Sequence, residues 1–407
     1  MSLSSRGALA DDFDQVFLIS SELGGNDGAV PSLEGRFDWI ENDPTEEATL
    51  LRLEAAKWTV AACRLGGYCI NEAEIPLLRL PDLIEGTQLF ASKPLKGPST
   101  WTTEFDYHLS SEISLTDVIL ELSKSQPVTL LLAGNAYSVG GNFTNGGLAS
   151  LEEALCIQST LHMSLRRAAK MAEDLGVEPP RWAAKDQPFQ PYIPGNGVII
   201  SPFVEIFRAG PENGFAFLQT VVDLAVLTIA MPNCNPALSQ PVDAPKDFSE
   251  YKQLVGDSIT AGLQAAVAIK SPVLIIPEVG GGLQQNDPRV VGDIISDLLL
   301  TQFPNAFAQV NFFGDEPFLL SCSRVEQGAQ DDPFGGVEAP LRQRPRSLGS
   351  DFSDELLGAH GGSASGTILD DAPNGLALSA ATLLGDGGAE GPRGTEPRTS
   401  FLGRCLT

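Results

Sequence analysis

Apolar and polar positions follow two different patterns along the middle of the chain. Short runs rich in Val, Ile and Leu, such as VLII at 273–276, predict strands that are buried on both faces. Between these runs apolar residues recur at spacings of three and four, which predicts amphipathic helices. This alternation is typical of an α/β protein with helices on both faces of a sheet. The expected strands are 128–133, 198–201, 204–207, 224–230, 273–277 and 309–313, and the expected helices are 45–62, 115–123, 151–175, 248–268 and 289–302.

The two ends of the chain lack this patterning. The first forty or so residues are acidic and weakly patterned, which predicts a loose arm over 1–40. From about residue 349 onward Gly, Ser, Pro, Asp and Glu dominate, a composition that predicts disorder. We therefore expect one α/β domain over 41–320 and a low-complexity tail over 321–407.

Acidic residues outnumber basic ones, 52 to 26, which gives a formal net charge of -26. This charge repels nucleic acid and anionic membranes, so we expect direct binding to neither. The first residues lack the basic start and apolar stretch of a signal peptide, and no long apolar run follows, which favours a cytoplasmic or nuclear protein. An anionic ligand would need a local site built from backbone groups.

The cysteines and histidines give no metal signature. The six cysteines form no C-x-x-C pair and the three histidines are scattered, which argues against zinc. Reduced thiols fit an intracellular compartment. We therefore expect neither a metal site nor a cofactor.

Two glycine-rich loops follow expected strands. The loop after 128–133 contains Gly140 and Gly141, and the loop after 273–277 contains Gly280, Gly281 and Gly282. Backbone amides in such loops, together with helix amino-terminal dipoles, can hold a diphosphate without any lysine. Neither loop completes a phosphate-loop or dinucleotide fingerprint. Ordinary turns therefore remain an open interpretation.

A glutamate pair, Glu152 and Glu153, stands at the start of the helix that follows the first glycine loop. Carboxylates are stabilised there by unpaired amides and the helix dipole. The spacing of Ser150 and Glu153 is that of a capping box, which would give Glu153 a purely structural role. Local sequence alone leaves both the chemical and the capping interpretation open.

The segment GGNFTNGGLASLEEALCIQSTL at 140–161 resembles the signature of the microbial-type poly(ADP-ribose) glycohydrolases. The signature consists of glycines, a short spacer, a glutamate pair and a continuation through cysteine to Ser-Thr-Leu. Gly140, Gly141, Glu152, Glu153, Cys156, Ser159, Thr160 and Leu161 match it. Further similar segments follow in the family's order at 200–208, 231–233, 286–288 and 307–313, so the resemblance covers about residues 40–315.

The resemblance implies a macrodomain-like three-layer α/β/α sandwich with a mixed, mostly parallel sheet. It also implies a glycosidase that hydrolyses the ribose–ribose O-glycosidic bonds of poly(ADP-ribose), free or on modified proteins, and releases ADP-ribose. Apart from the resemblance, we expect a monomer. Glu153 would be the general acid and base, and Glu152 would hold ribose hydroxyls. The implied ligand-binding residues are Gly140, Gly141, Asn142, Gly280, Gly281, Gly282, Leu283, Gln284 and Asn286.

Four positions depart from the family pattern. Asn142 stands for the third glycine, Leu151 for a glutamine, Gly281 for a cysteine and Gln284 for an aromatic residue. The last change removes a ring expected to stack on the ligand. These departures make a catalytically impaired module that binds ADP-ribose the alternative function. A third hypothesis is a scaffold that interacts through its tail.

Overall fold

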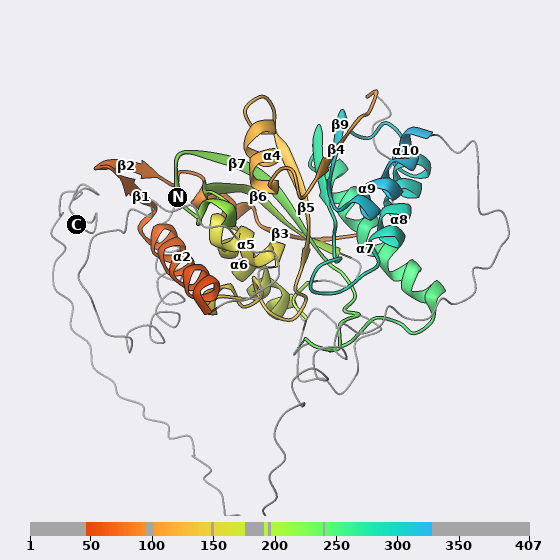
Figure 1. Cartoon of the computed structure of the whole chain (residues 1–407), viewed down its shortest axis with the longest axis horizontal. Helices are drawn as coiled ribbons and strands as arrows, with labels where there is room; N and C mark the ends of the chain where they lie inside the picture. Colours follow the sequence, from red (N-terminus) through yellow and green to blue (C-terminus); the bar gives the residue numbers. More distant parts are fainter. Residues whose placement is uncertain are drawn as a thin grey trace, which may run out of the picture. The chain divides into compact units, whose positions relative to one another are not determined.

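The computed structural model describes residues 46–93, 101–147, 150–175, 191–193, 197–238 and 241–327. Its centre is a seven-stranded sheet in the order β3-β6-β7-β5-β8-β9-β4, and a separate two-stranded sheet pairs β1 with β2 (Figure 1). The strands are β1 (Gly67–Ile70), β2 (Ala73–Pro76), β3 (Gln88–Ala91), β4 (Glu104–Leu109), β5 (Val128–Gly134), β6 (Gly197–Arg208), β7 (Phe217–Ala230), β8 (Val273–Pro277) and β9 (Gln309–Gly314).

Parallel pairing dominates the large sheet. β5 pairs in parallel with β7 and β8, and β9 pairs in parallel with β8 and β4. Among the described strands of this sheet, the antiparallel pairs are β3–β6 and β6–β7. The expected mixed, mostly parallel sheet is therefore confirmed.

Helices cover both faces of the sheet. The helices α2, α4, α5 and α6 share one apolar core with Leu130 and Leu132 of β5, whereas α7, α8 and α9 share another with Leu131. Neighbouring residues of a strand point to opposite faces, so these are the two outer layers of a three-layer α/β/α arrangement. The helices are α2 (Glu46–Leu65), α3 (Leu80–Gly86), α4 (Leu115–Leu122), α5 (Leu151–Gln158), α6 (Leu161–Leu175), α7 (Phe248–Ala268), α8 (Pro288–Thr301), α9 (Glu316–Cys322), α10 (Arg324–Gln327), and the short 3-10 turns η2 (Phe143–Asn145) and η3 (Pro211–Asn213).

The helix expected over 151–175 is wrong in one respect, because it is two helices. Ser159 is extended and forms a β-bridge with Ile206, which ends α5. The Thr160 amide donates to the Glu205 carbonyl at 3.1 Å, and the Glu205 amide donates to Thr160 Oγ1 at 3.0 Å. These bonds to β6 replace helical bonds that the apolar periodicity alone would predict.

The two strands expected at 198–201 and 204–207 are one strand, β6. Its register against β7 shifts between Ser201 and Val204, where Phe203 has a φ of 57°. Pro202 lacks an amide hydrogen and cannot donate to a sheet ladder, which explains why the interruption falls here. The gap between the two expected strands, at 202–203, is therefore the position of this irregularity in β6.

The ordered domain continues beyond the boundary expected at residue 320. Phe318, Cys322 and Val325 are buried and anchor α9 and α10 against the core, so the helices continue to Gln327. The expected arm over 1–40 lies outside the described residues, as does the tail expected over 321–407 except for residues 321–327.

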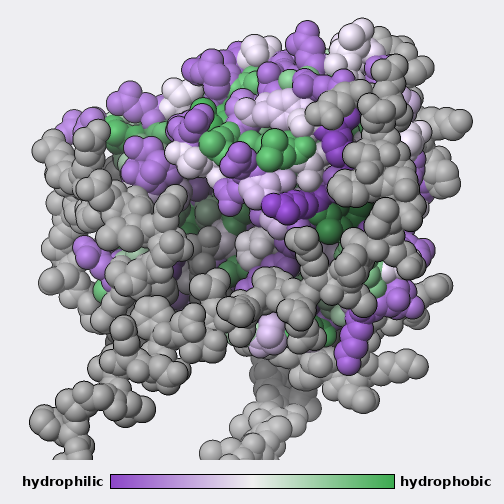
Figure 2. Space-filling view, turned by 45° about the vertical axis from the view of Figure 1, so that its right-hand side comes forward, coloured by the Kyte–Doolittle hydropathy of each residue, from purple (hydrophilic) through white to green (hydrophobic). Residues whose placement is uncertain are grey.

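In the part of the face that Figure 2 colours, hydrophilic residues (purple) surround small groups of hydrophobic residues (green). Scattered apolar surface of this kind is ordinary for a folded domain. Within the described ranges, no helix is long and apolar enough to cross a membrane.

Candidate active site

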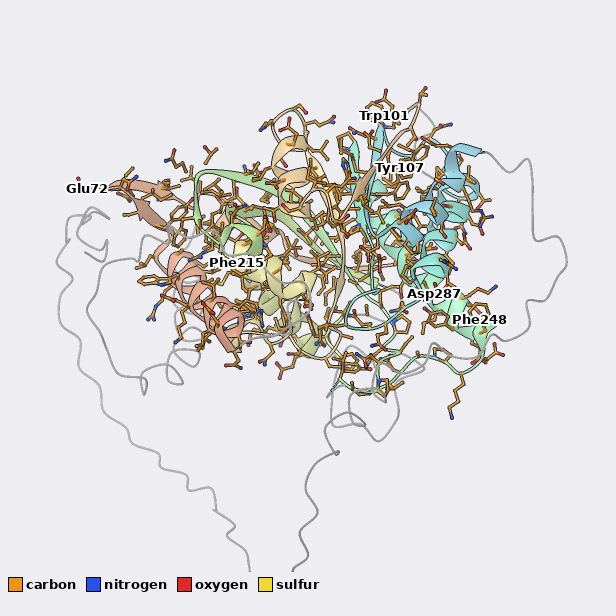
Figure 3. The ribbon with its side chains drawn as sticks, viewed as in Figure 1. Glu72, Trp101, Tyr107, Phe215, Phe248 and Asp287 are labelled. Atoms are coloured by element: carbon orange, nitrogen blue, oxygen red, sulfur yellow. The ribbon has the colours of Figure 1, made fainter. Side chains whose placement is uncertain are left out.

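The two glycine loops leave the sheet at neighbouring strands. β5 and β8 are adjacent and parallel, but the chain continues from β5 to α5 on one face and from β8 to α8 on the other. In α/β proteins, ligands commonly bind at such a topological switch point, outside the carboxyl ends of the strands. Asp287 and Phe248, which mark the starts of α8 and α7, lie at one end of the sheet, whereas Trp101, which precedes β4, lies at the other (Figure 3).

The first loop wraps around the carboxyl group of Glu153. The Asn142 amide donates to Glu153 Oε1 at 2.9 Å, and the Ser150 amide donates to Oε2 at 3.0 Å. Gly141 and Gly147 have φ angles of 63° and 56°, and a Cβ on either would lie 2.7 Å from a carbon of the Glu153 side chain. Glycine is therefore required at both positions by the conformation and by the close approach. Glu153 itself is 3% exposed.

The capping interpretation of Glu153 is confirmed. The Glu153 amide donates to Ser150 Oγ at 3.2 Å while the Glu153 carboxylate accepts from the Ser150 amide, which completes the capping box of α5. The same contacts hold the carboxylate against Gly141 in the first loop. Capping and chemistry are therefore compatible at this residue.

Glu152 is equally buried, at 3% exposure, and faces the end of β5. The Asn135 amide donates to its Oε2 at 2.7 Å, and the Tyr192 hydroxyl lies 3.4 Å from its Oε1. Burial raises the pKa of Glu152 to about 8, the negative charge of Glu153 adds to this, and the Asn135 amide opposes it. Burial therefore favours the protonated form of Glu152 relative to an ordinary glutamate.

Asn135 and Tyr192 were missed by the sequence analysis. Asn135 directly follows β5, so its position at the carboxyl end of a central strand was a usable signal. Tyr192 lies in a segment without periodic pattern, and its approach to Glu152 is purely tertiary.

Asn286 shapes the second loop from inside. Its Nδ2 donates to the carbonyls of Pro232 and Gly280, each at 2.9 Å, and its Oδ1 accepts from the Tyr251 hydroxyl at 2.8 Å. The side chain is 2% exposed. The hydrogen-bonding atoms of this side chain are therefore engaged within the protein, and direct contact of Asn286 with a ligand stays a prediction.

The three glycines of the second loop differ in their surroundings. Gly280 has a φ of 77° and lies against Asn286. A Cβ on Gly281 would lie 2.0 Å from Glu278 Oε1, so the carboxyl group covers that glycine, and burial raises the pKa of Glu278. Gly282 is exposed, and a Cβ there would meet nothing within 4 Å. Gly282 is thus the glycine of this loop whose backbone a ligand could approach most freely.

The segment after β7 connects the two loops. The Tyr137 hydroxyl of the first loop donates to Asp243 Oδ2 at 2.6 Å, and the Asn233 amide donates to Asp243 Oδ1 at 2.6 Å. The same segment reaches the second loop, where the Cys234 amide donates to the Gln284 carbonyl and Asn235 Nδ2 donates to the Leu283 carbonyl, both at 2.9 Å. The structure thus joins the predicted loops in one network, with Leu283 and Gln284 bound through their backbones.

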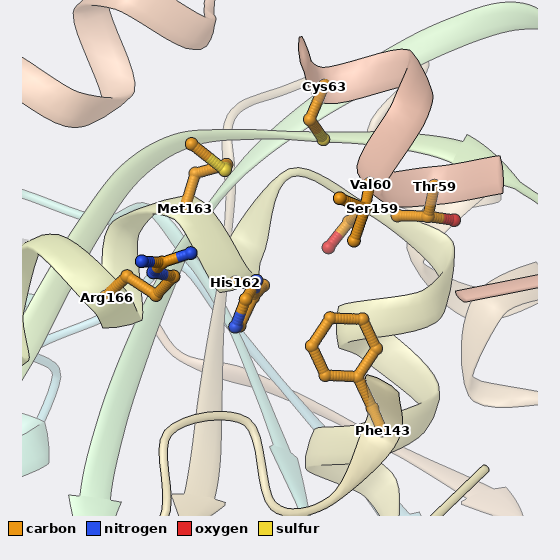
Figure 4. Close-up of a pocket in the computed structure, with 8 residues that line it drawn as sticks. All are labelled: Thr59, Val60, Cys63, Phe143, Ser159, His162, Met163 and Arg166. Atoms are coloured by element: carbon orange, nitrogen blue, oxygen red, sulfur yellow. The ribbon is translucent and has the colours of Figure 1, made fainter. Parts of the chain in front are cut away.

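A separate hollow lies between α2 and α6 (Figure 4). Its lining includes Phe143 and His162, whose rings meet edge to face with centroids 4.5 Å apart. Burial lowers the pKa of His162 to about 3, so the ring is neutral. Cys156 is fully buried, and burial raises the pKa of its thiol, which supports the prediction that the His162 and Cys156 pair belongs to the core. The hollow is lined mainly by apolar atoms and lies behind the first loop, apart from the carboxylate pair.

The expectation of reduced thiols throughout is wrong at one position. Cys69 is disulfide-bonded, whereas Cys63, Cys156, Cys234 and Cys322 are free. Cysteine spacing cannot reveal which residues approach each other in space, so no sequence pattern indicated this bond. Within the described part of the chain, no three His, Cys, Asp or Glu side chains are grouped so as to hold a metal ion.

The fold and the site define an α/β domain whose glycine loops and glutamate pair meet at a topological switch point. Residues 56–209 match the family described as the microbial-type PARG, catalytic domain. The predicted resemblance to the microbial-type poly(ADP-ribose) glycohydrolases is therefore confirmed.

The fold is similar to that of solved structures with this name. The crystal structure of poly(ADP-ribose) glycohydrolase from Thermomonospora curvata matches with a TM-score of 0.54 and 22% identity, and the match covers 67% of this chain and 98% of that one. A structure from the same organism, bound to the inhibitor ADP-HPD, matches with a TM-score of 0.53 at the same identity and coverage. At this identity the likeness concerns the fold. No curated protein sequence matches the chain.

Proposed function

We propose that this chain is a glycosidase that hydrolyses the ribose–ribose O-glycosidic bonds of poly(ADP-ribose) and releases ADP-ribose. The observation that carries this proposal is the position of the Glu153 carboxyl group, held against Gly141 of the first loop at a switch point where a ligand crevice is expected. The family match and the similar fold of enzymes with this name support it. We assign the activity to the domain expected over 41–320, extended by α9 and α10 to Gln327.

In the proposed reaction Glu153 donates a proton to the leaving ribose oxygen as the glycosidic bond breaks. The transition state then resembles an oxocarbenium ion, and the ionised carboxylate takes a proton from the water that attacks the sugar. The Asn142 and Ser150 amides, which both donate to the carboxyl group, hold it in place. Glu152 would hold ribose hydroxyls.

The diphosphate would lie along backbone groups. The turn at Gly140, Gly141 and Asn142 and the exposed Gly282 offer surfaces without bulky side chains. The other residues of the second loop, Gly280, Gly281, Leu283, Gln284 and Asn286, would fix the loop's shape through their internal contacts. Binding would therefore depend on loop conformation more than on side-chain charge.

Incubation of the full chain with labelled poly(ADP-ribose) tests this function, with released ADP-ribose measured by chromatography. We expect release by the wild-type chain and a loss of at least about 10²-fold in Glu153→Gln, since a positioned acid and base contributes that much or more. Glu85→Gln, which changes an exposed glutamate on α3, is the matched control. Equal rates for the wild-type and Glu153→Gln chains would refute the assignment.

A module that binds ADP-ribose without efficient turnover is the second candidate. It is favoured by the capping box, which engages both oxygens of Glu153, and by Leu151, Asn142 and Gln284 at positions where the family has other residues. Calorimetry that detects ADP-ribose binding, together with no product at high protein concentration, would select this function. Binding weaker than millimolar would exclude both candidates.

A further inference from the structure

Arg52 is a buried arginine on α2 that reaches the first glycine loop. It is 6% exposed, and its guanidinium donates to the carbonyls of Gly146 and Gly147, to the latter at 3.3 Å. It also donates to Thr49 Oγ1 at 3.1 Å on its own helix. A planar guanidinium can hold several acceptors in a fixed arrangement, which a lysine ammonium on its flexible stem cannot reproduce. Arg52 therefore ties α2 to two consecutive carbonyls of the loop.

The segment that Arg52 holds forms one wall around Glu153. A Cβ on Gly147 would lie 2.7 Å from Glu153 Cδ and 2.8 Å from each carboxylate oxygen. Gly146 has a φ of 91° and lies against Thr49, where a Cβ would come within 2.7 Å of the side chain. The wall is thus enclosed between α2 and the carboxyl group.

Gly141 and Asn142 form the opposite wall. Gly141 touches the Glu153 side chain, and the Asn142 amide donates to Oε1. The Glu153 carboxyl group is therefore held between two parts of one loop, and Arg52 supports the part formed by Gly146 and Gly147.

Arg52 also supplies a positive charge close to Glu153. Burial lowers the pKa of Arg52, and the negative charge of Glu153 opposes that effect. The other charged group beside Glu153 on its own helix is Glu152, which repels it when ionised. A buried cation behind the loop thus acts together with the loop amides on the same carboxylate.

We propose that Arg52 is a positioning residue for Glu153. Arg52 holds the carbonyls of Gly146 and Gly147, and this contact keeps the Glu153 carboxyl group in the position needed for proton transfer. The proposal rests on the proposed hydrolytic function. It differs from that function because Arg52 touches the loop and not the sugar or the leaving oxygen.

The test compares Arg52→Gln and Arg52→Lys with Lys57→Gln, which removes one positive charge from an exposed position of the same helix. For Arg52→Gln we expect kcat for ADP-ribose release to fall about 10²-fold, since a misplacement of 1 Å can cost this much, while KM changes less than about threefold. Arg52→Lys should recover part of the loss, and Lys57→Gln should match the wild-type chain. Calorimetric titration with ADP-ribose gives the fraction of folded, binding-competent protein, so a loss caused only by unfolding would lower kcat and stoichiometry equally. That equal loss, or an unchanged kcat, would overturn the proposal.

A second measurement is independent of activity. Hydrogen exchange of the Asn142 and Ser150 amides, which donate to Glu153, reports whether the loop still encloses the carboxylate. We expect exchange at least about tenfold faster in Arg52→Gln than in Lys57→Gln, because local opening is easier without the guanidinium. If the wild-type chain releases no ADP-ribose, the proposed function fails while this exchange result still decides the role of Arg52. Equal exchange in the two variants would refute that role.

Discussion

Replacement of Gly141 by alanine should separate the contact with Glu153 from ordinary backbone strain. Gly141 has a φ of 63°, and an added Cβ would lie 2.7 Å from Glu153 Cγ and 2.8 Å from Oε1. The left-handed conformation alone costs a residue with a side chain about 1–2 kcal/mol. Carbon atoms pack at about 3.5 Å, so the carboxyl group must also move by roughly 0.8 Å. Overpacking of this kind adds about 1–3 kcal/mol.

We expect Gly141→Ala to lose activity even where the protein remains folded, because the carboxyl group is displaced. A displacement near 1 Å can reduce the rate about 10²-fold, which corresponds to about 2.7 kcal/mol in the activation barrier. Gly214→Ala is the matched control, because Gly214 has a φ of 60° and a Cβ there would meet nothing within 4 Å. It carries the same backbone strain at a turn between β6 and β7, away from the glutamate pair.

Initial rates of ADP-ribose release give kcat for both variants, and urea denaturation gives their free energies of unfolding. Gly141→Ala should lose activity and stability, whereas Gly214→Ala should lose about 1–2 kcal/mol of stability and keep its kcat. If the two variants have equal kcat, then the contact between Gly141 and Glu153 has no catalytic meaning, and the reasoning fails.

Two further predictions concern buried polar groups. Asn286→Ala should lower the free energy of unfolding by about 3–5 kcal/mol, because buried groups of Pro232, Gly280 and Tyr251 lose their hydrogen-bond partner. Urea denaturation measures this loss, and Tyr251→Phe should lower the free energy of unfolding by less. Glu152→Gln should flatten the dependence of stability on pH. Because burial raises the pKa of Glu152 to about 8 from 4.5, its contribution to stability is complete below pH 4.5 and is lost as pH rises through about 8; thermal unfolding at several pH values would show no difference between the two chains if this is incorrect.

The strands and helices that bury continuous or periodic apolar surface could be predicted from the sequence. The runs at 128–133 and 273–277 became β5 and β8, which are buried along most of their length. The strands β1 to β4 were missed, because they are short or lie at sheet edges where exposed and apolar positions mix, as in β4. The break at Ser159 depends on β6, nearly fifty residues away in the chain, and no local pattern encodes it.

The sequence indicated which residues lie in the candidate site, but it did not indicate what each side chain contacts there. Glycine content and helix-start position marked Gly141 and Glu153, and the structure brings these two into contact. Asn286 carried an equally clear signal, yet its side chain points into the protein, because the amide satisfies two carbonyls that would otherwise be buried without partners. Arg52 gave no signal, since an arginine in an amphipathic helix usually faces solvent and only the tertiary structure shows its burial.

The net charge of -26 makes an unusual demand on a protein proposed to act on a polyanion, and it leads to a last prediction. A basic protein that binds such a polymer loses affinity as salt is added, through release of counterions. Here the averaged field repels the polymer, and salt screens that repulsion as the Debye length falls from about 30 Å at 0.01 M to about 8 Å at 0.15 M. The value of kcat/KM for poly(ADP-ribose) should therefore rise severalfold over this range, while kcat at saturation stays constant. The binding affinity for single ADP-ribose should change less over the same range. A steady fall of kcat/KM with salt would instead show that basic side chains, and not backbone groups, recognise the polymer.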